Sequence, residues 1–243
     1  MKILMLHGSR QSGELFSAKL QALEKLLKRA FGSGSNQPGA ELIYPTAPFS
    51  LAYESPSDTS KVRNQHGSWT WFQSESLDES FPGLDASLTL IASILRDSGP
   101  FDGIVGFSQG GALAAMVASL LEENRSEAFA RLSSEGEGGI PYPDCFAQLN
   151  HPPLKFVVCI SGYAASHSDY RAFYNPAIQT PMLHFLGSMD TVVEEESSMK
   201  LVGSCYRDDA NEPAVIWHSG GHIVPGGKRE LSAVTHFINL HKS

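Results

Sequence analysis

The residues that could do chemistry centre on GFSQG at positions 106–110, where a serine has a glycine two positions away on each side. The apolar run before it predicts a buried strand, and GGALAAMVASL after it predicts a helix. In a sharp strand-to-helix turn of the form G-x-S-x-G, the glycines avoid collisions and the serine hydroxyl is exposed. We therefore predict that Ser108 is a nucleophile; the alternative is an ordinary turn with Ser108 as a helix cap.

A serine hydroxyl attacks well only when a base accepts its proton, and a carboxylate should orient that base. In this kind of turn the expected chain order is Ser, then Asp or Glu, then His, with each residue following a strand. Asp190 follows MLHFLG, and His222 lies in the glycine-containing loop after AVIWH. We predict these two as the catalytic partners. His218 is the rival base but belongs to the strand, and the glutamates at 194–196 suit a solvated helix start.

Acyl transfer also needs hydrogen-bond donors for the negative oxygen of the transition state. The expected donors are the backbone N–H of the residue after the nucleophile, Gln109, and one from the loop after the first strand. That loop is LHGSRQSG, and Ser9 is the predicted donor, with His7 and Gly8 shaping the turn.

The elements that must position these residues alternate between short apolar runs and longer amphipathic stretches. Such alternation predicts a mostly parallel sheet of about six strands with helices on both faces, in a single α/β domain over residues 1–243. The expected strands are 2–6, 40–48, 102–107, 154–162, 181–190 and the start of 213–222, and the expected helices are 14–31, 84–97, 110–123, 195–206 and 227–241.

Two stretches interrupt this alternation, residues 49–83 and 123–153. Long irregular segments inside a compact domain are usually functional or disordered. We expect both to be insertions that form a lid or a pocket wall.

Composition excludes several classes of function. A net charge of −8 argues against a nucleic-acid surface. The three cysteines have neither metal-ligand nor disulfide spacing, which favours a reducing compartment, and we expect a cytoplasmic protein. No stretch approaches the roughly 20 apolar residues of a membrane span. No cofactor and no metal are expected.

Six motifs carry a resemblance to a known family: LHGSRQSGELFSAKL, YPTAPF, WTWF, GFSQGGALAA, PMLHFLGSMDTVV and HSGGHIVP. In this order they resemble the fungal small serine hydrolases related to the human ovarian-cancer-associated hydrolase, a group that includes free-standing polyketide-releasing thioesterases. The resemblance implies an α/β-hydrolase that uses Ser108, Asp190 and His222 on acyl esters or thioesters. Family members often carry a large residue where Ser9 stands, so a wider site is expected here.

The substrate is the part of the prediction that the sequence leaves open. One hypothesis is a thioesterase that releases an acyl or polyketide chain from an acyl carrier domain of a polyketide synthase. A second is a general carboxylesterase on short or medium acyl esters, and a third is a binding protein without activity. The aromatic residues expected to line the pocket are Trp69, Trp71, Phe72, Tyr163 and, in the first hypothesis, Tyr170.

Overall fold

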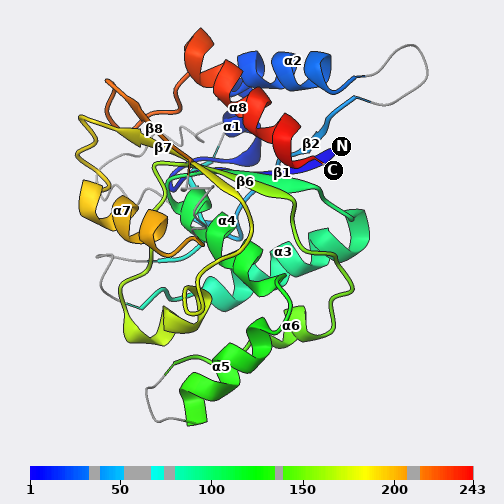
Figure 1. The fold of residues 1–243 in the computed structure, drawn as a ribbon, viewed down its shortest axis with the longest axis vertical. Coiled ribbons are helices and arrows are strands. Elements are labelled where there is room, and N and C mark those ends of the chain that lie inside the picture. The colour runs from blue at the N-terminus through cyan, green and yellow to red at the C-terminus, as the bar shows by residue number, and fades with distance from the viewer. Residues whose placement is uncertain (33–38, 52–66, 74–79, 135–138, 207–213, 243) are drawn as a thin grey trace, which may run out of the picture.

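The computed structural model describes residues 1–32, 39–51, 67–73, 80–134, 139–206 and 214–242. At its centre is a six-stranded sheet in the order β2-β1-β5-β6-β7-β8, in which every neighbouring pair is parallel (Figure 1). Its strands are β1 (Lys2–Leu6), β2 (Glu41–Ile43), β5 (Gly103–Phe107), β6 (Phe156–Ile160), β7 (Met182–Gly187) and β8 (Ala214–His218). The predicted α/β-hydrolase architecture is confirmed.

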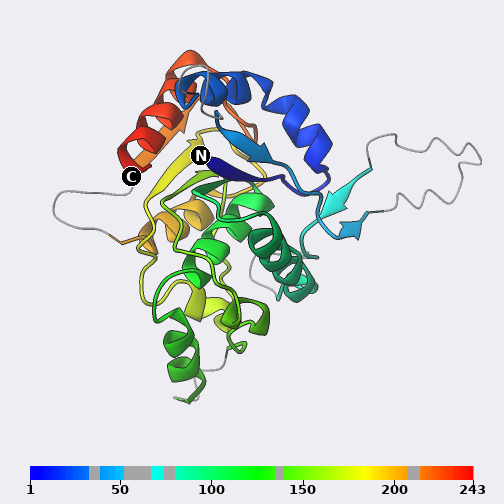
Figure 2. The same cartoon turned by 90° about the vertical axis from the view of Figure 1, so that its right-hand side faces the viewer.

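Helices cover both faces of this sheet, as Figures 1 and 2 show. Alternation along β1 illustrates the reason: Ile3 and Met5 belong to one apolar core, and Leu4 and Leu6 to the other. The first core is closed by α1 (Gly13–Lys19), α2 (Gln21–Ala30) and α8 (Lys228–His241). The second is closed by α3 (Leu84–Ser98), α4 (Gln109–Leu120), α5 (Arg125–Ser134) and α7 (Glu195–Gly203).

Three features differ from the sequence prediction. The helix expected at 14–31 is divided at Leu20, whose N–H is shared between the carbonyls of Phe16 and Ser17. The stretch 49–83 contributes a small antiparallel pair, β3 (Phe49–Ser50) and β4 (Trp69–Thr70). The stretch 123–153 contains α5 and α6 (Asp144–Ala147), and a 3₁₀ helix, η2 (Ser168–Phe173), follows β6.

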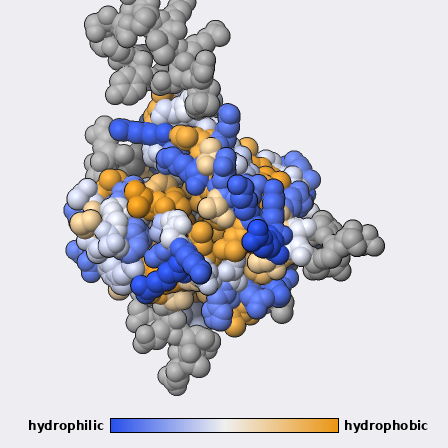
Figure 3. Space-filling view, turned by 90° about the horizontal axis from the view of Figure 1, so that it is seen from above, coloured by the Kyte–Doolittle hydropathy of each residue, from blue (hydrophilic) through white to orange (hydrophobic). Residues whose placement is uncertain are grey.

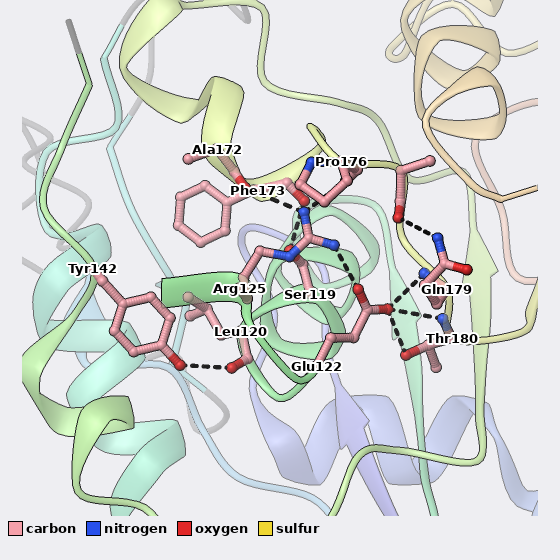
Figure 4. A network of polar contacts seen from close by, with 11 residues as sticks. Ser119, Leu120, Glu122, Arg125, Tyr142, Ala172, Phe173, Pro176, Gln179 and Thr180 are labelled. Carbon is pink, nitrogen blue, oxygen red and sulfur yellow. Dashed lines mark hydrogen bonds and ion pairs between the residues drawn. The ribbon is translucent and has the colours of Figure 1, made fainter. Parts of the chain in front are cut away.

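A buried ion pair fixes the end of α4 to the chain that leads into β7 (Figure 4). Glu122 pairs with Arg125, and their side chains are 9% and 2% exposed. The other carboxylate oxygen of Glu122 accepts hydrogen bonds from the N–H groups of Gln179 and Thr180, at 2.7 and 2.8 Å. Arg125 donates to the carbonyl of Pro176 at 2.6 Å. A charge pair with this many additional partners holds loop 172–180 in place.

Seen from the side of α2 and α8, the surface mixes hydrophilic and hydrophobic residues and shows no single continuous apolar face (Figure 3). Within the ranges that the structure describes, none of the helices has the length and apolar character needed to cross a membrane.

Candidate active site

Ser108 lies on a tight turn between β5 and α4, as predicted. Its backbone is in a conformation that side-chain-bearing residues rarely adopt, with φ 55° and ψ −120°. The flanking glycines are required by space: a Cβ at Gly106 would collide with the carbonyl of Gly110, and one at Gly110 would collide with the carbonyl of Leu6. The turn therefore places Ser108 at the amino end of α4, with its side chain directed away from the sheet.

His222 contacts both of its predicted partners. Its Nε2 lies 2.8 Å from Ser108 Oγ, and its Nδ1 lies 2.8 Å from Asp190 Oδ2. With Nδ1 protonated, the ring donates to the carboxylate and Nε2 can accept the hydroxyl proton. Phe107 packs on the imidazole, with ring centroids 4.9 Å apart. The His222 side chain is 16% exposed, so the site is open to solvent at this ring.

Asp190 is held in its charged form. Burial of the carboxyl raises its pKa, but hydrogen bonds outweigh this effect and leave the pKa below its usual value. The N–H groups of Val192 and Val193 donate to Oδ1 at 2.9 and 3.0 Å, while His222 occupies Oδ2. The carboxylate is therefore fixed and negatively charged beside the imidazole.

His218, the rival base, lies elsewhere. Its Nδ1 accepts a hydrogen bond from the N–H of Gly220 at 3.2 Å, and its Nε2 is buried without a partner among the described residues. Among the described residues, Ser108 Oγ has a hydrogen bond to His222 and none to His218.

The loop after β1 packs directly against Ser108. A Cβ placed on Gly8 would lie 3.3 Å from Ser108 Cβ and 2.9 Å from the Phe107 ring, so glycine permits this approach. His7 fixes this loop through two hydrogen bonds. The side chain is fully buried, its Nε2 accepts from the N–H of Ala47 at 3.0 Å, and its Nδ1 donates to the Gly8 carbonyl at 2.7 Å. Burial lowers the pKa of His7 to about 4, which keeps the ring neutral.

Gln109 has a second role that its sequence position did not predict. Its Oε1 accepts from the Thr70 hydroxyl at 2.9 Å and from the Trp71 N–H at 2.8 Å, and its Nε2 donates to the Phe72 carbonyl at 2.8 Å. The indole of Trp71 in turn donates to the His7 carbonyl at 2.8 Å. The start of α4, segment 70–72 and the loop after β1 are thus joined by buried hydrogen bonds.

The aromatic residues expected to line the pocket lie instead mainly in the interior. Trp71, Phe72 and Tyr163 are between 0% and 5% exposed, and Tyr170 is 4% exposed. Trp69 forms a backbone bridge with Gln11. The cavity of about 660 Å³ at Ser108 has other walls: Ser9, Arg10, Gln11, Lys19, Phe107, Val192, His222, Ile223 and Val224.

The two inserted stretches meet at a separate cavity of about 500 Å³. Its walls include Phe81 and Gly83 from the first stretch, Ile140 and Cys145 from the second, and Tyr170 from η2. Whether either stretch acts as a lid remains a prediction, and 52–66, 74–79 and 135–138 lie outside the described residues.

Comparison with known proteins decides the family. The model of the serine hydrolase (FSH1) family matches residues 1–234. The chain belongs to this serine hydrolase family. This agrees with the resemblance stated above, and the protein is a serine hydrolase.

Individual proteins are similar to this serine hydrolase over most of its chain, and a solved structure shares its fold. Esterase OVCA2 of Danio rerio is 30% identical, with 98% of this chain and 96% of that protein aligned. A Schizosaccharomyces pombe protein named dihydrofolate reductase is 34% identical over 93% of this chain, but the chain spans only 44% of its length. The crystal structure of Zea mays acyl-protein thioesterase 2 has a TM-score of 0.57 at 21% identity, covering all of this chain and 94% of that one.

Among the described residues of this serine hydrolase, no group of three or more His, Cys, Asp or Glu side chains is placed to hold a metal ion.

Proposed function

We propose that Ser108, His222 and Asp190 form a catalytic triad that hydrolyses acyl esters and thioesters. One observation carries the proposal: the His222 ring joins the Ser108 hydroxyl and the Asp190 carboxylate, each at 2.8 Å. These side chains follow three different strands, β5, β7 and β8, so the arrangement does not arise from local sequence.

In the proposed reaction His222 Nε2 accepts the proton of Ser108 as Oγ attacks the acyl carbonyl. The backbone N–H groups of Gln109 and Ser9 stabilise the negative oxygen, aided by the positive end of the α4 dipole. His222 then protonates the departing alcohol or thiol, and water attacks the acyl-serine in the same way to release the acid. Asp190 holds the ring in the required tautomer and stabilises its charged form.

The triad is tested with three variants and one probe. Ser108→Ala should abolish labelling by a fluorophosphonate, and Asp190→Asn should lower kcat for p-nitrophenyl butanoate by about 10⁴-fold. His218→Gln is the control, because this histidine lies away from Ser108, and it should leave kcat within about threefold. Labelling at another residue, or an active Ser108→Ala enzyme, would overturn the assignment.

Within this activity, release of an acyl or polyketide chain from a carrier domain is the narrower proposal, and it rests on the family resemblance alone. General carboxylesterase activity is the alternative. Comparing kcat/KM for a butanoyl thioester and its oxygen ester separates them: a marked thioester preference supports the first, and equal rates on many simple esters support the second.

A further inference from the structure

The cavity at Ser108 has an uneven distribution of charge. Its ionisable wall residues besides His222 are Arg10 and Lys19, both cationic, and none of its described wall residues is acidic. This contrasts with a chain whose formal net charge is −8. Acidic residues outnumber basic ones in the chain, 26 to 18, so a cavity whose charged wall residues are all basic differs in sign from the molecule as a whole.

Arg10 is fixed close to the reacting serine. It directly follows Ser9 in the loop whose Gly8 packs against Ser108. Its backbone is left-handed, with φ 62°, and its N–H donates to the Trp69 carbonyl at 2.8 Å. This bridge to β4 holds the Arg10 backbone in place, so its side chain starts from a defined point on the cavity wall.

Both cations are available for a ligand. Within the described ranges neither Arg10 nor Lys19 forms an ion pair, and both are exposed. Lys19 is the last residue of α1, where the partial negative charge of the helix end favours a cation. Their charges are thus not neutralised by described carboxylates.

Other residues of the cavity wall are apolar. Val192 and Ile223 are 65% and 52% exposed, and Val224 lies beside them in the wall. A substrate complementary to these wall residues has an apolar portion and a negative group that reaches Arg10.

We propose that the Ser108 cavity selects substrates that carry, besides the scissile ester or thioester, an anionic group bound by Arg10 and Lys19. This inference rests on the proposed ester and thioester hydrolysis at Ser108. The anion is a carboxylate or a phosphate, since guanidinium and ammonium groups bind both. The carboxylate would lie at the far end of the acyl chain, whereas the phosphate would belong to the leaving group of a thioester.

Two substrate pairs distinguish these sources. In the first, mono-p-nitrophenyl adipate carries a free carboxylate and its methyl ester does not. In the second, butanoyl-coenzyme A carries phosphates and S-butanoyl-N-acetylcysteamine does not. For each pair the measured quantity is the ratio of kcat/KM for the anionic substrate to that for the neutral substrate.

The test compares Arg10→Gln/Lys19→Gln with Lys25→Gln/Arg29→Gln, which removes the same charge from exposed positions on α2. For at least one pair we expect the ratio to fall about tenfold in the first variant and to stay unchanged in the second, because charge-assisted hydrogen bonds contribute of that order. Raising the salt from 0.02 to about 0.5 M should also lower the wild-type ratio.

Each outcome has a defined meaning. A fall only for the adipate pair places the anion in the acyl portion, and a fall only for the coenzyme A pair places it in the leaving group. Arg10→Lys/Lys19→Arg should retain most of the ratio if it folds like the wild type. Equal ratios in the wild type and both double variants, with neutral esters still hydrolysed, would overturn this inference and leave the proposed function standing. Failure of the wild type to hydrolyse any of the four substrates would overturn both.

Discussion

The side-chain oxygen of Gln109 accepts a hydrogen bond from the hydroxyl of Thr70, which lies 39 positions earlier in the chain. The same oxygen accepts from the Trp71 N–H, and the amide nitrogen donates to the Phe72 carbonyl. Gln109, whose backbone N–H is one expected oxyanion donor, therefore also fixes segment 70–72 through its side chain. That segment in turn contacts the loop that carries the other expected donor, Ser9.

Gln109→Ala should impair both stability and activity. It leaves the buried N–H of Trp71 without its acceptor and removes one of the two donors to the Phe72 carbonyl, which should lower the free energy of unfolding by about 1–3 kcal/mol. It should also lower kcat, because the loop at Ser9 is less well fixed. Urea unfolding and ester hydrolysis measure the two effects. Gln73→Ala, at an exposed position, is the matched control and should change neither; an unaltered Gln109→Ala protein would contradict the role given to this side chain.

Gly110→Ala should prevent formation of the turn at Ser108. The added Cβ would collide with the carbonyl of Leu6 and approach that of His7, both in rigid backbone. We expect a loss of about 3 kcal/mol or more in the free energy of unfolding, from overpacking. Gly203→Ala at the end of α7 is the control, because its Cβ would meet nothing within 4 Å. In thermal denaturation the midpoint of Gly110→Ala should fall strongly, and that of Gly203→Ala should stay close to the wild-type value.

Acid should destabilise the fold through two buried histidines. Burial lowers the pKa of His7 and of His184 to about 4, whereas an unfolded histidine titrates near 6.5. Between pH 6.5 and 4 these histidines are protonated in the unfolded chain but remain largely neutral in the folded chain. The free energy of unfolding should therefore fall as the pH drops from 6.5 to 4, with each histidine adding up to about 1.4 kcal/mol per pH unit.

His184→Leu isolates one of these contributions. Urea unfolding at pH 7 and pH 5 should show a smaller loss on acidification in this variant than in the wild type. His236→Gln, at an exposed position on α8, should keep the wild-type difference. Identical pH dependence in all three proteins would show that burial of His184 does not govern acid stability.

Arg125→Met should be strongly destabilising, because it leaves Glu122 charged and largely buried without its cation. Removing one partner of such a pair costs about 3–5 kcal/mol. Arg96→Met breaks the exposed pair with Asp97 and should cost no more than about 1 kcal/mol. Chemical denaturation decides between them, and similar midpoints for the two variants would contradict the structural role of the Glu122–Arg125 pair.

The sequence predicts the sheet and the positions of Ser108, Asp190 and His222 well, for a physical reason. Apolar runs mark the strands, and the carboxyl ends of parallel strands converge at one edge, so residues just after them meet. The part it could not predict depends on contacts across the chain. The family resemblance implies that Trp69 and Trp71 line the pocket, yet they contact the loop after β1 through backbone and indole hydrogen bonds. Nothing in local sequence indicates those partners.

The order of the strands places Ser108 and His222 after strands that differ in how well they are held in the sheet. Ser108 follows β5, which is paired on both sides and buried throughout, whereas His222 follows β8, an edge strand with intermediate burial along most of its length. Edges of a sheet open more readily than its centre. Mild denaturant should therefore separate His222 from Ser108 first, and hydrolysis should cease at a lower urea concentration than that at which far-UV circular dichroism reports global unfolding.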